Sequence, residues 1–316
     1  INMKYIVSLI YSIIIIFPTI CFSEKNQDAW HIKTNVYLEI EEYRGQRDAF
    51  NNKVYDKIST VGKLKLTNPA SDWHFALEHR ESLRNHGRNF SPSRDAYIRN
   101  RTQFDITKKL VKSKQSDLDL SFRYRKESND SAPGTKARSS NRLYALTPSG
   151  NYYFNDNLSF NFWLSYLYYS NYFNSNSYEA ETEYGITYQH SDALKAKLTV
   201  YIDKLWDNSF SDRFIQSQLR AYFPITLNDN WQFTPYFRYY LSEHTYDENH
   251  YLTQKAKNGF RIGADVEYHV TPSLTLWGGA AYEPTTWQYS KKNDITSGDN
   301  NKQVLYLGKI GVKYTW

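Results

Sequence analysis

Apolar and polar residues alternate one by one along most of the chain, in segments of about 10 residues separated by turn or loop residues. The clearest segment runs from Tyr178 to Gln189. Its even positions carry tyrosine, alanine, threonine and isoleucine, whereas its odd positions begin with Glu179, Glu181 and Glu183. Successive side chains of a β-strand point to opposite faces, so a strand separates these two sets and a helix would mix them. The pattern predicts an all-β chain.

About fourteen segments share this pattern. Their approximate cores are 30–42, 56–67, 73–82, 97–107, 118–126, 142–154, 158–169, 178–189, 193–203, 214–226, 231–242, 259–268, 273–283 and 304–316. The sixth is the weakest, because Pro148 and Gly150 interrupt it.

The segments are joined by connections of alternating length. Short turns are expected at 68–72, 155–157, 190–192, 228–230 and 270–272, with a longer basic turn at 108–116. Long loops are expected at 43–55, 83–96, 127–141, 170–177, 204–213, 243–258 and 284–303. An even number of strands with short periplasmic turns and long external loops is typical of a transmembrane antiparallel β-barrel.

Composition supports a barrel in the outer membrane of a Gram-negative bacterium. The 316 residues have a mean hydropathy of −0.72 and are 23% charged, yet 17% are aromatic and 29 are tyrosine. After the N-terminal segment, no stretch approaches the roughly 18 apolar residues that a membrane-spanning helix needs. Tyrosine and tryptophan are the residues that form girdles at the two membrane interfaces of a barrel.

The first 23 residues are expected to be a secretory signal peptide. Met3 and Lys4 form a short basic start, an apolar run follows at 5–17, and small residues precede a cleavage site after Ser23. The alternatives are an uncleaved anchor or a lipoprotein modified at Cys21. Residues 24–316 then form a single barrel domain without cysteine, which leaves no disulfide or thiolate metal site.

The polar faces of the predicted strands carry many charges of both signs. An arginine or lysine that faces lipid at the bilayer centre costs about 2–4 kcal/mol, so these charges are expected to face a lumen, and about fourteen strands leave room there for water. The alternative is a set of internal salt-bridge ladders that leave no passage. The expected pore-lining residues are Lys63, Lys65, Arg99, Arg101, Arg123, Arg125, Glu179, Glu181, Glu183, Lys195, Lys197, Arg220, Arg238, Arg261, Asp265 and Glu267.

The last segment carries a candidate assembly signal. Tyr314 and Trp316 are aromatic, and apolar residues precede them at alternate positions back to Val304. This pattern resembles the signal that the β-barrel assembly machinery reads, so that machinery, outer-membrane lipid and lipopolysaccharide are the expected partners. The alternative is an ordinary edge strand.

Several stretches resemble the outer-membrane porin G (OmpG) family. They are AWHI at 29–32, YLEIE at 37–41, and four stretches between Leu158 and Ser242: LSFNFWLSYLYY, YEAETEYGITYQ, QSQLRAYFPITL and TPYFRYYLS. The resemblance implies a monomeric fourteen-stranded porin for passive, weakly selective diffusion of ions and small hydrophilic solutes, including sugars.

The resemblance also implies that the sixth external loop closes the lumen at low pH through a pair of repelling histidines. The matching positions here fall near Lys257 and within 287–290, and neither holds a histidine. His244 and His250 lie in the matching loop, and histidine changes charge between about pH 5 and 8. They are candidate gate residues; the alternative is two solvated loop histidines without a role.

Other classes of barrel fit the sequence less well. An enzyme would need a catalytic set near the external rim, but His31 and His74 fall near the periplasmic end without a serine motif, so we predict no catalytic residues, metal or cofactor. A twelve-stranded acidic-oligosaccharide porin (KdgM type) would share the basic rows but not the acidic ones. No loop resembles the constriction loop of a trimeric porin, and an adhesin would differ only in lacking conductance. The charges are spread along the strands, so nucleic acid is not an expected partner.

Overall fold

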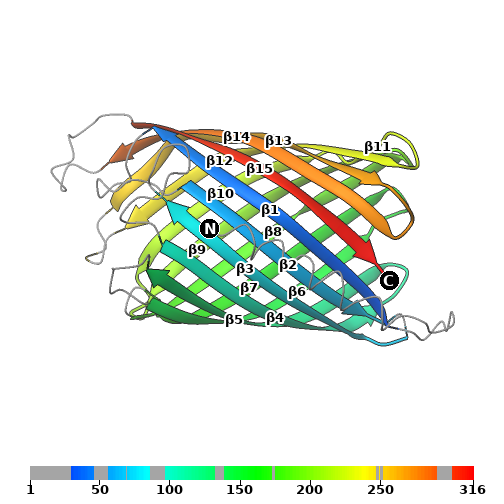
Figure 1. The fold of residues 1–316 in the computed structure, drawn as a ribbon, viewed down its shortest axis with the longest axis horizontal. Helices are drawn as coiled ribbons and strands as arrows, with labels where there is room; N and C mark the ends of the chain where they lie inside the picture. The colour runs from blue at the N-terminus through cyan, green and yellow to red at the C-terminus, as the bar shows by residue number, and fades with distance from the viewer. Residues whose placement is uncertain are drawn as a thin grey trace, which may run out of the picture.

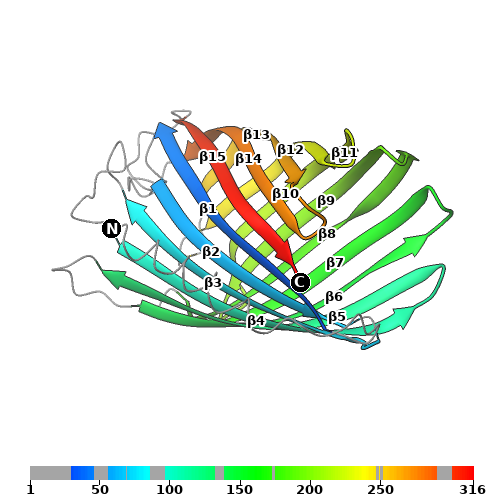
Figure 2. The same cartoon turned by 45° about the vertical axis from the view of Figure 1, so that its right-hand side comes forward.

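The computed structural model of the chain is a β-barrel whose strands run obliquely to its long axis (Figure 1, Figure 2). It describes residues 30–45, 56–68, 70–85, 97–131, 139–172, 175–246, 249, 252–289 and 301–316. The expected signal peptide at 1–23 lies outside these residues. The strands are β1 (His31–Gly45), β2 (Asp56–Thr67), β3 (Trp73–Asn85), β4 (Tyr97–Lys112), β5 (Ser116–Ser131), β6 (Ser139–Tyr153), β7 (Leu158–Tyr172), β8 (Ser175–Ser191), β9 (Leu194–Asp207), β10 (Asp212–Tyr222), β11 (Ile225–Thr226), β12 (Trp231–Tyr246), β13 (Leu252–His269), β14 (Leu274–Tyr289) and β15 (Asn301–Thr315).

The sheet closes on itself with fourteen antiparallel strands. β1 pairs with β15 from Lys33 opposite Thr315 to Gly45 opposite Gln303, so the first and last strands form the seam. β11 continues β10, because Ile225 pairs with β12 and β9, the two neighbours of β10. Pro224, which has no N–H group, separates the two pieces. The predicted fold class is therefore confirmed.

Large apolar side chains lie on the outside of the wall. Ile310 is 67% exposed, Ile262 54% and Leu146 50%. Few large apolar side chains among the described residues are fully buried; Val61 and Leu143 are examples. A water-soluble protein rarely exposes so large an apolar surface, whereas a barrel in lipid requires it. Among the described residues, no helix is long and apolar enough to span a membrane.

The weakest predicted strand, 142–154, is present as β6. Pro148 lies opposite Leu120 of β5, and the pairing of β6 with β7 skips from Leu146 to Ser149. The proline thus interrupts one ladder locally and leaves the strand continuous. Gly150 is required here, because a Cβ at this position would overlap the main-chain carbonyl of Asp117.

Asparagine side chains close three of the short turns in the same way. The Oδ1 atoms of Asn68, Asn155 and Asn228 each accept a hydrogen bond from the main-chain N–H two residues later, at 2.8–2.9 Å. Such Asx turns explain why asparagine begins these turns. In Figure 1 the C-terminal end of β15 and the start of β1 lie at the barrel end that carries the β13–β14 turn.

Several connections are shorter than the sequence predicts, including those expected at 127–141, 243–258 and 284–303. The loop expected at 204–213 is a four-residue turn between Asp207 and Asp212, the one at 170–177 falls between Tyr172 and Ser175, and the basic turn at 108–116 lies between Lys112 and Ser116. The strands continue past the apolar band, where polar residues appear on both faces and the alternation fades. Because the alternation fades there, the sequence pattern predicts a loop where the strand in fact continues.

Gly185 lies where β8 and β9 approach too closely for a side chain. A Cβ there would lie 2.6 Å from the Cα of Thr199 and closer still to the carbonyl oxygen of Leu198, whereas a Cβ at Gly62 would meet nothing within 4 Å. We expect Gly185→Ala to lower the free energy of unfolding by about 1–3 kcal/mol. The control Gly62→Ala is expected to change it by less than about 0.5 kcal/mol. Urea unfolding in micelles measures both, and equal midpoints would contradict the expectation.

Candidate functional site: the charged inner wall

Ion pairs that skip a strand identify the inner face of the wall. Arg80 of β3 contacts Glu39 of β1 at 2.8 Å across β2, and Arg220 of β10 contacts Glu183 of β8 at 2.7 Å across β9. Lys313 of β15 contacts Glu267 of β13 at 2.6 Å across β14. Side chains converge on the concave side of a curved sheet, so contacts across an intervening strand belong to the inside. The inward set agrees with the alternation in the sequence.

The four arginines predicted on β4 and β5 form one basic group. Each lies directly opposite its acceptor on the paired strand. Arg101 Nε contacts Glu127 Oε1 and Arg123 Nε contacts Asp105 Oδ1, both at 2.6 Å. Arg99 and Arg125 donate to the amide oxygens of Asn129 and Gln103, each at 2.9 Å. Arg125 also lies 3.8 Å from Glu127, so the four guanidinium groups share two carboxylates, which leaves this side of the wall positive.

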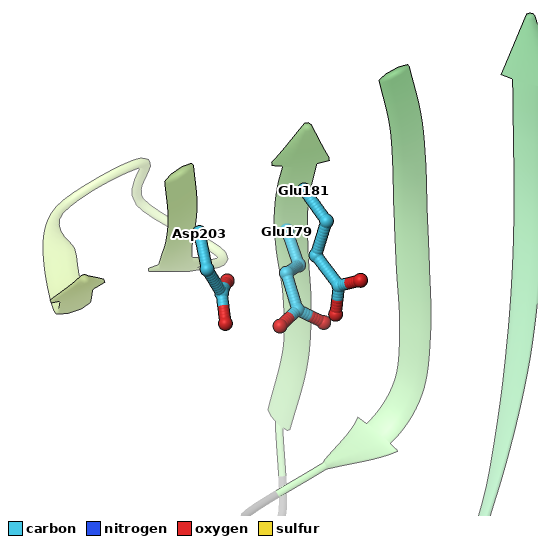
Figure 3. Close-up of side chains that lie close together, drawn as sticks. All are labelled: Glu179, Glu181 and Asp203. Atoms are coloured by element: carbon cyan, nitrogen blue, oxygen red, sulfur yellow. The ribbon is translucent and has the colours of Figure 1, made fainter. Parts of the chain in front are cut away.

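An acidic group lies on β8 and β9. The carboxylates of Glu179, Glu181 and Asp203 lie close together (Figure 3). One oxygen atom of each is within 4.8 Å of the corresponding atoms of the other two. Tyr169 donates a hydrogen bond to Glu179 at 2.5 Å, and Tyr201 donates one to Asp203 at 3.3 Å. The sequence spacing did not predict this cluster, because it depends on Glu181 lying directly opposite Asp203.

An apolar patch separates the basic and acidic groups on the inner wall. Leu143, Ala145 and Leu167 of β6 and β7 are at most 3% exposed and pack together with Tyr169. Leu143 lies opposite Arg125, and Leu167 lies opposite Glu179. The alternation in the sequence does not predict this patch, because it places apolar side chains on the lipid-facing side.

Other predicted lining residues form pairs around the rest of the wall. Lys63 contacts Glu78 at 2.8 Å, Lys197 lies 3.9 Å from Glu183, and Arg261 donates to Glu283. In the part of the chain that the structure describes, no ion pair is recorded for Lys65 or Lys195. The charges are thus partly compensated and are not gathered into a single catalytic arrangement. His31 and His74, the two histidines considered for a catalytic role, both lie opposite Thr67.

The candidate gate histidines are separated by the structure. His244 lies within β12 instead of the loop predicted at 243–258, and it is opposite Lys255 of β13. His250 lies outside the described residues. The strand is longer than predicted because residues 243–245 are polar on both faces, so the alternation of apolar and polar residues no longer marks the strand there. Whether either histidine gates the lumen stays a prediction.

The candidate assembly residues lie at the end of the seam that carries the β13–β14 turn (Figure 1). The rings of Tyr314 and Trp316 are 4.5 Å apart at 64°, and the main-chain N–H of Trp316 donates to the carbonyl of Ile32 at 2.9 Å. Their role as an assembly signal stays a prediction.

Comparison with known proteins agrees with this architecture. The chain matches the family described as Outer membrane protein G (OmpG) over residues 27–314. It is 26% identical to Outer membrane porin G of Escherichia coli (strain K12) over 180 residues, a match that covers 55% of this chain and only 56% of that relative. The fold is similar to two solved structures, the CymD monoaromatic hydrocarbon channel (9% identity, TM-score 0.53, 92% of this chain and 90% of that one) and the P. putida toluene transporter TodX (8%, 0.53, 90% and 89%).

At such low identity the two structures support the fold alone, whereas the family match covers nearly the whole barrel. The closed fourteen-stranded wall, its apolar exterior and its charged interior fit that match. The chain therefore belongs to the outer membrane protein G (OmpG) family, whose members are β-barrels of the Gram-negative outer membrane.

Proposed function

We propose that this chain forms a water-filled channel for passive, weakly selective diffusion of ions and small hydrophilic solutes, including sugars. One observation carries the proposal: inward-facing charged side chains remain exposed to solvent. The side chains of Lys63, Lys313 and Lys197 are 43%, 38% and 37% exposed. They lie inside a closed barrel, so the water that reaches them occupies the lumen.

The lining of this channel is part of the proposal. It comprises the predicted residues Lys63, Lys65, Arg99, Arg101, Arg123, Arg125, Glu179, Glu181, Glu183, Lys195, Lys197, Arg220, Arg238, Arg261, Asp265 and Glu267. Both acidic and basic groups line the wall, and a lumen with both signs keeps water and ions of either charge. This mixture supports weak selectivity.

Recording in a planar bilayer tests the channel. We expect the purified protein to give discrete single-channel current steps in KCl, because charged side chains of the inner wall remain exposed to water. Each molecule is expected to give one step, since we infer a monomer. Silence at every voltage and pH would refute the channel, and coupled triple steps would refute the monomer.

The other classes are separated by the same recording. An acidic-oligosaccharide porin would favour acidic sugars strongly over neutral ones, but the acidic group on β8 and β9 argues against this. The family assignment favours a channel over an enzyme. An adhesin or a purely structural barrel would give no current.

A further inference from the structure

Three arginines lie side by side on adjacent strands of the inner wall. Arg220 of β10 is directly opposite Arg238 of β12, and Arg238 is directly opposite Arg261 of β13. Opposite residues of an antiparallel pair have Cα atoms about 4.5–5.5 Å apart, and like charges in such positions repel. The row therefore needs negative charge to compensate it.

The two outer arginines have a carboxylate, and the central one does not. Arg220 contacts Glu183 at 2.7 Å, and Arg261 donates to Glu283. Among the residues that the structure describes, Arg238 makes no ion pair, and its Nε atom is buried without a hydrogen-bond partner. The charge of Arg238 is thus the uncompensated one of the row.

Two tyrosines and two glycines shape the surroundings of Arg238. Tyr236 and Tyr240 flank it along β12 and lie over Gly263 and Gly259 of β13: a Cβ at Gly259 would lie 3.0 Å from the ring of Tyr240, and one at Gly263 would overlap the ring of Tyr236. The guanidinium carbon of Arg238 is 5.5 Å from the centroid of the Tyr236 ring. The glycines leave room for both rings against β13, on either side of Arg238 along the strand.

The carboxylate of Asp265, on this part of β13, points toward β14 instead of toward the arginine row. A carboxylate oxygen of Asp265 occupies the space that a Cβ of Gly279 on β14 would take. Asp265 interacts electrostatically with Lys309 and Lys313 as well as with Arg238, so its single charge is shared among three cations. It does not neutralise the arginine row.

We propose that Arg238, with Arg220 and Arg261 beside it, is a binding site in the lumen for small solutes that carry a phosphate or carboxylate group. A guanidinium group offers two parallel N–H donors that match such an oxyanion, and adjacent positive charges strengthen the interaction. The inference rests on the proposed channel, because the solute reaches Arg238 from the lumen.

Inorganic phosphate is the probe for this site. Single-channel current in KCl is recorded while phosphate is added at constant pH and ionic strength. We expect phosphate to reduce the current of the unmodified protein, and Arg238→Gln to raise the half-blocking concentration about tenfold or more, as expected for the loss of a charge-assisted hydrogen bond. The control Arg101→Gln removes the same charge from a guanidinium group already paired with Glu127 at 2.6 Å, and its shift is expected to stay below about threefold.

The outcomes separate the site from the channel. A protein that conducts in KCl but shows no phosphate-dependent decrease would overturn the binding site and leave the channel intact. Equal shifts in Arg238→Gln and Arg101→Gln would also overturn it, because they would report only the total charge of the lumen. Absence of any conductance in the unmodified protein would contradict the channel and this site with it.

Discussion

Replacing Glu39 with glutamine is expected to lower the free energy of unfolding by about 3–5 kcal/mol. Glu39 is 4% exposed and contacts three cations from three other strands. Arg80 lies at 2.8 Å, Lys57 at 3.2 Å and Lys309 at 3.3 Å. Glutamine keeps the shape of the side chain but removes its charge. Lys57 would keep its contact with Glu41 at 2.5 Å, but Arg80 and Lys309 would lose their nearest carboxylate in a partly buried place, and this is the source of the loss.

Unfolding by urea in lipid vesicles, followed by tryptophan fluorescence, measures the effect. The matched control is Glu42→Gln on the same strand. Glu42 contacts Arg44 at 2.9 Å, but the two side chains are 38% and 65% exposed, so the change is expected to cost only about 0–1 kcal/mol. If both variants lose the same stability, the contacts of Glu39 do not hold the seam.

The place of Glu39 illustrates what alternation can and cannot predict. Its odd position among apolar even positions puts it on the inner face, as the sequence indicates. Its partners depend on register, since Lys309 is opposite Glu39 on the last strand and Arg80 reaches it across β2. A period of two assigns the face of each residue, but it carries no information about which residue of a distant strand lies opposite.

The fold could be predicted from the sequence because a side chain of the wrong polarity on the lipid-facing side costs free energy. A charge turned outward or a lipid-facing gap would cost several kcal/mol, so the pattern persists along the membrane-spanning part of every strand. That penalty disappears beyond the bilayer. This is why β8 begins at Ser175 and β12 continues to Tyr246, where the sequence indicated loops.

Alternation indicates which charged residues face inward, but it does not indicate how they group. Glu181 and Asp203 each fall on a polar face, yet their contact requires the register of β8 on β9. Leu143 and Leu167 face inward, where they separate the arginines of β5 from the glutamates of β8. An inward leucine differs in no local way from an outward one, so only the closed barrel reveals this patch.

Replacing Ile310 with arginine is expected to lower the free energy of unfolding in lipid by about 2–4 kcal/mol. Ile310 is 67% exposed on the outside of β15 and lies midway between Tyr306 and Tyr314 on the same face. These tyrosines are candidates for the two interfacial girdles, since aromatic rings collect at both membrane surfaces. An arginine between them would face the hydrocarbon, where its guanidinium group loses its hydration.

The matched control is Val304→Arg, on the same face of β15 but beyond Tyr306. Near the interface the cost of an arginine falls to about 0–1 kcal/mol, since its side chain can reach water. Urea unfolding in lipid vesicles measures both variants. In detergent micelles the two variants should differ much less, because a micelle lets water reach the middle of the apolar outer surface between Tyr306 and Tyr314. Equal losses for Ile310→Arg and Val304→Arg in lipid would mean that the tyrosines do not mark the membrane boundaries. A larger loss for Ile310→Arg than for Val304→Arg would establish how deeply β15 lies in the membrane. Because β15 pairs with β1 and β14, the result would also establish the depth of these two strands.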